Sequence, residues 1–312
     1  MSDPADPQAL RARIEAARAL LAEHDGPAAL TPRLADPLPR LIEQCRAAAE
    51  AVAGREAEPL RTLHHFACTG GTVIARHLAV QPNTILLSEI DPFSRTQVDG
   101  MPLHFAPTDL IRHLRYSARE IPEPVIGAVF LGALAPLQAH CRASGSRLVL
   151  RDHAHSQFCH GTAPHDHPTL RGLLLRAYPV RSVVTVRHPL ESWLSLRHNG
   201  WVHFAPATLE EYARRYLAFL AAYAGVELVR YEDFVADPEA RLEALCTTLE
   251  LPFAGLQEEL LDLMPLTGGS GRTGRKIAAR PRRAVPPEVA EQAAQSPQYA
   301  ALCARLGYDP AP

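Results

Sequence analysis

Residues that suit anion binding stand where an apolar run gives way to a helical pattern. The run 62–67 leads into the segment Cys68-Thr69-Gly70-Gly71-Thr72-Val73. A strand that passes through a glycine pair into a helix aims backbone N–H groups at one point, which favours an anion such as phosphate. No Gly-Lys-Ser/Thr follows, which argues against an ordinary ATP or GTP loop. The alternative is a plain strand-to-helix turn whose glycines allow tight packing.

A second set of residues suited to phosphate follows the apolar run 182–186. Arg187 comes directly after this run, Pro189 suits the first position of a helix, and Ser195 lies eight residues after the arginine. A guanidinium supplies a charged fork and a hydroxyl supplies a neutral donor, so Arg187 and Ser195 could hold one phosphate. The alternative is an arginine that pairs with a neighbouring carboxylate.

A third set could move a proton, because Arg151 and His153 follow the apolar run 147–150. An imidazole at a strand end can accept the proton of a hydroxyl, which makes His153 a candidate general base. The surrounding segment is dense in residues that can bind zinc, namely His153, His155, Cys159, His160, His165 and His167. Their spacing matches no metal pattern, so a polar histidine-rich loop without metal is expected.

The elements that must position these residues follow one another as alternating strands and helices. Strands are expected at 62–67, 84–87, 147–150, 182–186 and 226–229, and helices at 71–80, 108–117, 124–144, 189–197, 209–224 and 238–249. The alternation predicts a three-layer α/β fold with a central parallel sheet of about five strands flanked by helices. Ligands of such sheets bind where the strands end, and all three sets of residues stand there.

Two regions lie outside this alternation. Residues 1–58 carry apolar positions at helical spacing, interrupted by Pro27 and Pro32, which predicts an N-terminal helical extension packed on the core. Residues 59–312 then form the α/β domain. Within this domain, proline and basic residues dominate 268–287, which predicts a surface loop before a last helical tail.

Charge and composition limit the class of function. The 312 residues carry a net charge of -2, which gives no bias toward nucleic acid or an anionic membrane surface. The six cysteines form no CxxC pair, and the acidic, proline-rich first residues lack the parts of a secretory signal. No apolar run of membrane-spanning length is expected. We therefore expect a cytoplasmic protein without nucleic-acid or membrane partners, and the sequence does not predict its oligomeric state.

The order of these segments resembles the PAPS-dependent sulfotransferases, in a bacterial-type member with a P-loop-like fold; PAPS is 3'-phosphoadenosine 5'-phosphosulfate. Arg187-x-Pro189 with Ser195 looks like the family's 3'-phosphate-binding segment. The segment 229–242, with its Tyr231-Glu232-Asp233, resembles the strand and Asp-Pro helix that follow in the family. The basic stretch 271–276 sits where family members carry a late loop over the nucleotide. The similarity covers roughly residues 60–285.

The resemblance implies a role for each of these segments. It places the donor's 5'-phosphosulfate in the first loop, against Cys68, Thr69, Gly70, Gly71, Thr72 and Val73. It places the 3'-phosphate against Arg187 and Ser195, with Arg272 or Arg275 at the same end. Glu89 becomes a rival base to His153, because other branches of the family use a carboxylate at the end of the second strand; we favour His153.

One position departs from the family. Its members usually carry Lys or Arg in the first loop where this chain has Thr69, and sulfuryl transfer needs positive charge at the leaving oxygen. Arg151 is our first choice as the substitute, followed by His65 and Arg76. The expected function is transfer of a sulfuryl group from PAPS to a hydroxyl or amine of a small-molecule acceptor, without a metal. The alternatives are a non-catalytic nucleotide-binding protein derived from a sulfotransferase and a P-loop kinase-like phosphotransferase.

Overall fold

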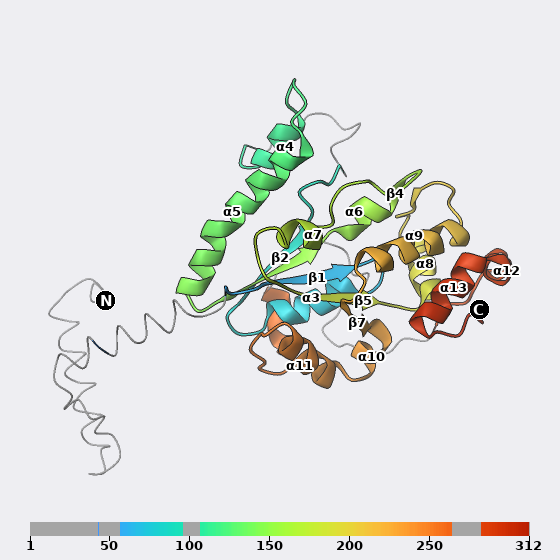
Figure 1. The fold of residues 1–312 in the computed structure, drawn as a ribbon. Coiled ribbons are helices and arrows are strands. Elements are labelled where there is room, and N and C mark those ends of the chain that lie inside the picture. Colours follow the sequence, from blue (N-terminus) through green and yellow to red (C-terminus); the bar gives the residue numbers. More distant parts are fainter. Residues whose placement is uncertain (1–42, 44–56, 96–106, 264–281, 312) are drawn as a thin grey trace, which may run out of the picture. The chain divides into compact units, whose positions relative to one another are not determined.

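Five parallel strands form one sheet in the computed structural model of the chain (Figure 1). The structure describes residues 43, 57–95, 107–263 and 282–311. The strands are β1 (Leu60–His65), β2 (Thr84–Ile90), β3 (Arg147–Asp152), β5 (Val180–Val186) and β7 (Glu227–Arg230), in the order β2-β3-β1-β5-β7. Every neighbouring pair is parallel. Each of the five predicted runs overlaps one of these strands, so the predicted central parallel sheet is confirmed.

The register of the sheet brings the carboxyl ends of the strands to one edge. Leu63 of β1 lies between Arg151 of β3 and Val183 of β5. His65 lies opposite Thr185, so β1 and β5 end together and their following loops begin side by side. The three sets of polar residues expected from the sequence follow these strand ends. The sheet therefore positions them along a single edge.

Helices cover both faces of the sheet and complete the three layers (Figure 1). Alternate residues along each strand point to opposite faces, so Val149 packs toward one layer while Leu148 and Leu150 pack toward the other. The first layer contains α3 (Gly71–Ala79) and α11 (Pro238–Thr248), and the second contains α5 (Glu123–Ala143) and α7 (Leu170–Leu174). The side chains of β1 and all but the first of β3 are buried, so the middle of the sheet is the centre of the core.

The remaining elements are shorter or lie beyond the sheet edge. They are α4 (Leu110–Arg115), α6 (Ala154–Phe158), α8 (Pro189–His198), α9 (Leu209–Ala222), α10 (Tyr231–Ala236), α12 (Pro287–Gln295), α13 (Pro297–Leu306) and the 3-10 helix η1 (Glu258–Leu263). The two-residue strands β4 (His160–Gly161) and β6 (His203–Phe204) pair with each other. Helices α6, α7 and α10 are each too short to show a helical period, so they were not predicted from the sequence.

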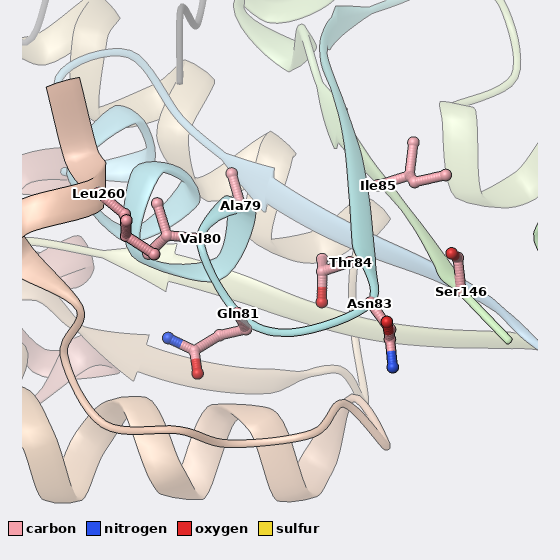
Figure 2. A pocket seen from close by; sticks show the side chains of 8 residues that line it. All are labelled: Ala79, Val80, Gln81, Asn83, Thr84, Ile85, Ser146 and Leu260. Atoms are coloured by element: carbon pink, nitrogen blue, oxygen red, sulfur yellow. The ribbon is translucent and has the colours of Figure 1, made fainter. Parts of the chain in front are cut away.

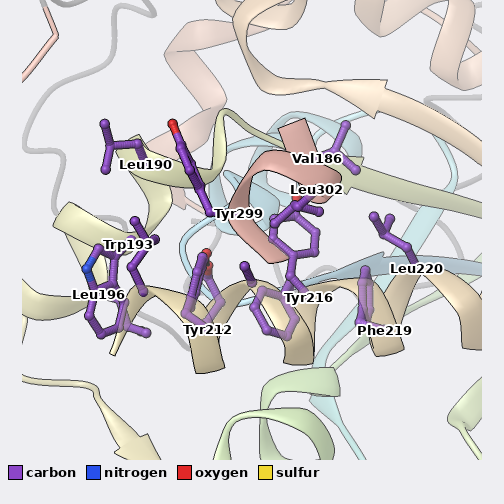
Figure 3. Packing of buried hydrophobic residues seen from close by; sticks show 14 of the residues in the cluster. Val186, Leu190, Trp193, Leu196, Tyr212, Tyr216, Phe219, Leu220, Tyr299 and Leu302 are labelled. Atoms are coloured by element: carbon purple, nitrogen blue, oxygen red, sulfur yellow. Dashed lines mark hydrogen bonds between the residues drawn. The ribbon is translucent and has the colours of Figure 1, made fainter. Parts of the chain in front are cut away.

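An aromatic cluster fills the space between α8, α9 and α13 (Figure 3). Trp193, Tyr212 and Tyr216 are at most 1% exposed, and burying a side chain of this size contributes about 1.5–3 kcal/mol. Tyr216 stacks on Phe66 of the first loop, with 4.5 Å between the ring centres. Its Oη also accepts the N–H of Arg187 at 3.3 Å. The cluster thus anchors both loops that the sequence associates with anion binding.

Helix α5 differs from what the sequence analysis expected. It has no Asp, Glu, Lys or Arg between Glu123 and Arg142, so by length and composition alone it could cross a membrane. The expectation that no apolar run reaches this length is therefore corrected. Ile126 and Leu134 of α5 are buried inside the fold, although only 28% of the apolar window of this helix is buried. One such helix is weak evidence for a membrane protein.

Two predicted regions fall largely outside the described residues. The N-terminal helical extension over 1–58 is described only at Glu43, Ala57 and Glu58, and therefore it stays a prediction. The proline-rich and basic loop over 268–287 is described only from Arg282 onward. Beyond it, α12 and α13 form the predicted helical tail.

Candidate active site at the carboxyl edge of the sheet

The first loop joins β1 to α3 through a tight turn. Gly70 has φ 91°, in the left-handed region that glycine adopts most readily. A Cβ at Gly70 would lie 2.2 Å from Cδ2 of Tyr231, and one at Gly71 would lie 2.4 Å from Cγ of His65. Both glycines are thus required by packing, as the plain-turn alternative supposed. The turn also leaves the N–H groups of Gly71 and Thr72 at the start of α3, where no intrahelical acceptor exists.

The other loop residues divide into buried and half-buried positions. The hydroxyl of Thr69 is buried, donates to the carbonyl of Phe66 at 2.8 Å and lies 3.2 Å from Oγ1 of Thr185. Val73 packs in the core beside the sheet. Cys68 is half-buried, and this burial raises the pKa of its thiol to about 11, so the thiol stays protonated near neutral pH. At Thr69 and Val73, only the backbone is placed to meet a ligand.

Arg187 lies directly beside the first loop. Its Nη1 is 3.4 Å from the carbonyl oxygen of Cys68 and 3.3 Å from Oγ of Ser195. The guanidinium also stands over the ring of Tyr231, 4.9 Å from the ring centre, and its Nη2 is 3.7 Å from Glu191. Arg187 and Ser195 therefore lie together, as predicted. The alternative, an arginine paired with a carboxylate, is present in the longer contact with Glu191. The two proposed anion positions share one side of the sheet.

Arg151 connects β3 with the start of α3 and with the end of β2. Its Nη2 donates to Oγ1 of Thr72 at 2.8 Å, and its Nη1 donates to Oγ of Ser88 at 2.8 Å and lies 2.5 Å from Oε1 of Glu89. The side chain is 2% exposed, so the ion pair with Glu89 holds its charge in a buried position. Arg151 thus brings a guanidinium to the first turn of α3.

The other two candidates for that cation are placed differently. His65 is buried, and desolvation holds its pKa well below the usual value, with the nearby Arg151 guanidinium adding to the effect. His65 is therefore neutral near pH 7. Arg76, further along α3, donates to the carbonyl of Leu261 in η1 at 2.9 Å. Of the three candidates, Arg151 is the one whose cation contacts a side chain of the first loop.

Glu89 is aimed by a strained piece of backbone. Its φ is 58°, unusual for a residue with a side chain, and the pairing of β2 with β3 shifts register between Leu87 and Ile90. Such a bulge redirects a side chain at a sheet edge. Burial raises the pKa of the Glu89 carboxyl, and the charge of Arg151 opposes this rise.

His153 faces Glu89 across the strand ends. Its Nε2 lies 3.5 Å from Oε2 of Glu89, and its ring packs edge-on against His155 with 3.8 Å between ring centres. Burial lowers the pKa of His153 to about 4, an effect that the nearby Asp152 opposes and Arg151 reinforces. Burial also holds the pKa of His155 well below its usual value. Both imidazoles are therefore neutral near pH 7 and can accept a proton.

A buried polar network below the site was missed by the sequence analysis. Oδ2 of Asp152 is 2.6 Å from Nδ1 of His64 and accepts the hydroxyl of Tyr223 at 2.6 Å. The other ring nitrogen of His64 lies 2.8 Å from Oγ1 of Thr62, which is 2.7 Å from Oγ of Ser182. Polar residues inside apolar runs were the available signal, because buried polar groups need partners. The network fixes the end of β3 just before His153.

A cavity elsewhere in the fold has no such chemistry (Figure 2). It is lined by Ala79, Val80, Gln81, Asn83, Thr84, Ile85, Ser146 and Leu260. Thr84 begins β2 and Ser146 precedes β3, so this cavity lies at the opposite edge of the sheet from the polar cluster. None of its lining residues carries a charge or titrates near neutral pH.

Comparison with known proteins then identifies the family. The model of the sulfotransferase family matches residues 16–255. The chain belongs to the sulfotransferase family. A search of curated proteins finds no match. Among solved structures, the sulfotransferase domain of the Synechococcus PCC 7002 olefin synthase is similar at TM-score 0.49 and 18% identity, covering 82% of this chain and 96% of that chain. The sulfotransferase from Alicyclobacillus acidocaldarius is similar at TM-score 0.40 and 16% identity, covering 81% of this chain and 98% of that chain.

Within this member of the family, the predicted site residues fall into three groups: those that gather at the edge of the sheet, those whose side chains turn inward, and those outside the described residues. In the first group, Arg187 contacts the carbonyl of Cys68 and the hydroxyl of Ser195 beside the glycine turn. Glu89, Arg151 and His153 form the neighbouring cluster, which Arg151 links to Thr72 of the same loop. Thr69 and Val73 share the loop but turn their side chains inward. Arg272 and Arg275 lie outside the described residues, so their predicted role is neither supported nor opposed.

Proposed function

We propose that this sulfotransferase transfers a sulfuryl group from PAPS to a hydroxyl or amine of a small-molecule acceptor. The observation that carries the proposal is the position of Arg187, whose Nη1 lies 3.4 Å from the carbonyl oxygen of Cys68 and 3.3 Å from Oγ of Ser195. PAPS has an anionic group at each end of its adenosine. A guanidinium paired with a hydroxyl beside the glycine turn supports the binding of both ends by one edge of the sheet.

The residues of the first loop fit the 5' end of such a donor. The N–H groups of Gly71 and Thr72 open a nine-residue helix that has no acidic residue in its first turn. A phosphosulfate placed there would meet the positive end of the helix and no carboxylate from that turn. Arg151 brings a guanidinium to this turn, because its Nη2 donates to the hydroxyl of Thr72 while its Nη1 pairs with Glu89. This supplies the cation that Thr69 does not.

The neighbouring cluster fits the proton transfer that the reaction requires. As the acceptor oxygen forms its bond to sulfur, the bond from sulfur to the donor phosphate breaks and the acceptor hydroxyl loses its proton. Oε2 of Glu89 and Nε2 of His153 lie 3.5 Å apart, so one bound hydroxyl can contact both. Either atom can take the proton. Arg151 and the N–H groups of α3 would then stabilise the charge on the departing phosphate.

A second candidate function, binding of the nucleotide without catalysis, is favoured by the position of Thr69. Position 69 is a threonine, which carries no charge, and its hydroxyl donates to the carbonyl of Phe66. The loop therefore supplies no cationic side chain at that position. A chain of this kind could bind the nucleotide without turnover. The two proposals make the same prediction for nucleotide binding and opposite predictions for catalysis.

The experiment combines calorimetry with turnover by the full-length chain. We expect PAP, the desulfated product (adenosine 3',5'-bisphosphate), to bind at least tenfold more tightly than AMP or ATP, because only PAP carries the 3'-phosphate. We expect labelled PAPS to transfer its sulfuryl group to at least one member of a library of hydroxyl and amine acceptors. ATP binding in preference to PAP would refute the donor assignment. Tight PAP binding without transfer to any acceptor would favour the non-catalytic alternative.

A further inference from the structure

Three side chains with metal-binding atoms converge beside the first loop. They are Glu89 from the bulged end of β2 together with His153 and His155 from the junction of β3 and α6. One ligand atom from each lies within 4.8 Å of the other two. Among the residues that the structure describes, this is the one group of three such ligands. The spacing of the histidines over 153–167 predicted no metal, and Glu89, which comes from a different strand, was not part of that pattern.

The separation of the ligand atoms suits a small divalent cation. Zinc binds imidazole nitrogen and carboxylate oxygen at roughly 2.0–2.2 Å, so two ligands of a tetrahedral ion lie about 3.3–3.5 Å apart. Nε2 of His153 and Oε2 of Glu89 are 3.5 Å apart. The ring of His155 packs edge-on against that of His153, with 3.8 Å between centres. Small rotations of the rings would bring all three atoms onto one ion.

The carboxylate is already oriented for such a role. Oε1 of Glu89 is taken by Arg151, whereas Oε2 is buried and accepts no hydrogen bond from the described residues. An outer partner that fixes one oxygen and leaves the other free is typical of metal-binding carboxylates. The charge of Arg151 opposes a cation, but Glu89 and the buried Asp152 both lie close enough to interact with that guanidinium. Two carboxylates therefore offset one guanidinium around the cluster.

We propose that Glu89, His153 and His155 form a zinc site with its fourth position left to water or a bound ligand. Two histidines and one glutamate are an established zinc ligand set. Zinc on Oε2 of Glu89 and Nε2 of His153 would occupy the lone pairs that accept the acceptor's proton. The zinc-bound enzyme would then be inhibited. This consequence rests on the proposed function, whereas zinc binding itself does not.

The test is calorimetric titration of the full-length, metal-free chain with zinc chloride. We expect one zinc ion per chain with a dissociation constant in the micromolar range or below, and no binding of magnesium chloride, because magnesium prefers oxygen ligands. Glu89→Gln and His155→Gln should each weaken zinc binding at least tenfold. The matched control is His140→Gln, an exposed histidine on α5, which should bind zinc like the wild type.

Two results would overturn the site. The first is equal zinc affinity in the wild type and in the double variant Glu89→Gln/His155→Gln. The second is a loss of zinc affinity in His140→Gln as large as that in Glu89→Gln or His155→Gln. Circular dichroism and PAP affinity verify that each variant is folded. Zinc should also lower the transfer rate at least tenfold, and a chelator should restore it. Zinc binding with no effect on sulfuryl transfer would overturn the proposed inhibition. Zinc binding by a chain that does not bind PAP would refute the proposed function and leave the metal site intact.

Discussion

Replacing Arg187 by alanine tests ligand binding at this site with little effect on folding, because the native contacts of this side chain are long. Its guanidinium lies 3.4 Å from the carbonyl of Cys68, 3.3 Å from Ser195 and 3.7 Å from Glu191, and it stands over the ring of Tyr231. Ion pairs and cation–π contacts of partly exposed side chains contribute about 0–1 kcal/mol each. We expect Arg187→Ala to lower the free energy of unfolding by about 1 kcal/mol.

The loss in nucleotide affinity should be much larger. A hydrogen bond to a charged group contributes about 1.5–3 kcal/mol, so a guanidinium that donates to a 3'-phosphate is worth about 2–4 kcal/mol when water has been displaced. The dissociation constant for PAP should therefore rise about 30- to 700-fold. Ser195→Ala removes a neutral donor worth about 0.5–1.5 kcal/mol and should raise that constant about 2- to 12-fold.

The assay compares PAP with AMP, which lacks the 3'-phosphate. Wild type should prefer PAP, and Arg187→Ala should abolish most of this preference while leaving AMP affinity nearly unchanged. The control is Arg181→Ala, because Arg181 is an exposed arginine at the start of β5 that pairs with Glu250, away from the carboxyl ends of the strands. Unchanged PAP affinity in Arg187→Ala would show that Arg187 does not bind the 3'-phosphate. So would an equal loss of affinity for PAP and AMP, since Arg187 would then not read the 3'-phosphate.

Two further predictions concern stability. Gly70→Ala should destabilise the fold by about 3 kcal/mol, because a Cβ there would lie 2.2 Å from the ring of Tyr231 at φ 91°. Gly132 lies in α5 with no atom within 4 Å of an added Cβ, so Gly132→Ala should stabilise the fold by about 0.5–1 kcal/mol. Urea unfolding of both variants measures these opposite changes in stability. Equal changes in the two variants would contradict the prediction. Burial lowers the pKa of His77, so its contribution to stability is complete above about pH 6.5 and is lost as the pH falls toward the lowered value. The free energy of unfolding of wild type and that of His77→Gln should therefore differ less at pH 5 than at pH 7. The difference should shrink by at most about 1.4 kcal/mol per pH unit. A difference that stays constant in urea unfolding between pH 7 and pH 5 would rule out this titration.

The strands and most of the long helices were predictable because their signals are local. An apolar run of a few residues followed by a longer helical pattern predicts one strand and one helix wherever it occurs. Expected boundaries agree with the structure to within a few residues at β3 and α8. Parallel strands also place all their carboxyl ends on one edge, so the edge that holds Arg187 and the first loop followed from the alternation alone.

The positions of single side chains in the site were less predictable. Thr69 was expected to contact the donor, yet its hydroxyl turns toward Phe66 and Thr185 because the left-handed turn at Cys68 and Gly70 directs it inward. The direction of that side chain depends on backbone angles that residue types do not specify. The role of Arg151 as the substitute cation was proposed from the sequence, and its contact with Thr72 is the geometry that supports it.

The class of fold, the five strands of the central sheet and the edge at which the polar residues gather could all be predicted from the sequence, because these depend on patterns within short segments. Which of the polar residues contact one another depends on the tertiary structure. Glu89, Arg151 and Thr72 come from β2, β3 and α3, and their contacts require β3 to lie between β2 and β1 with a bulge at the end of β2. Strand order and register arise from the packing of the whole chain, and no local pattern encodes them.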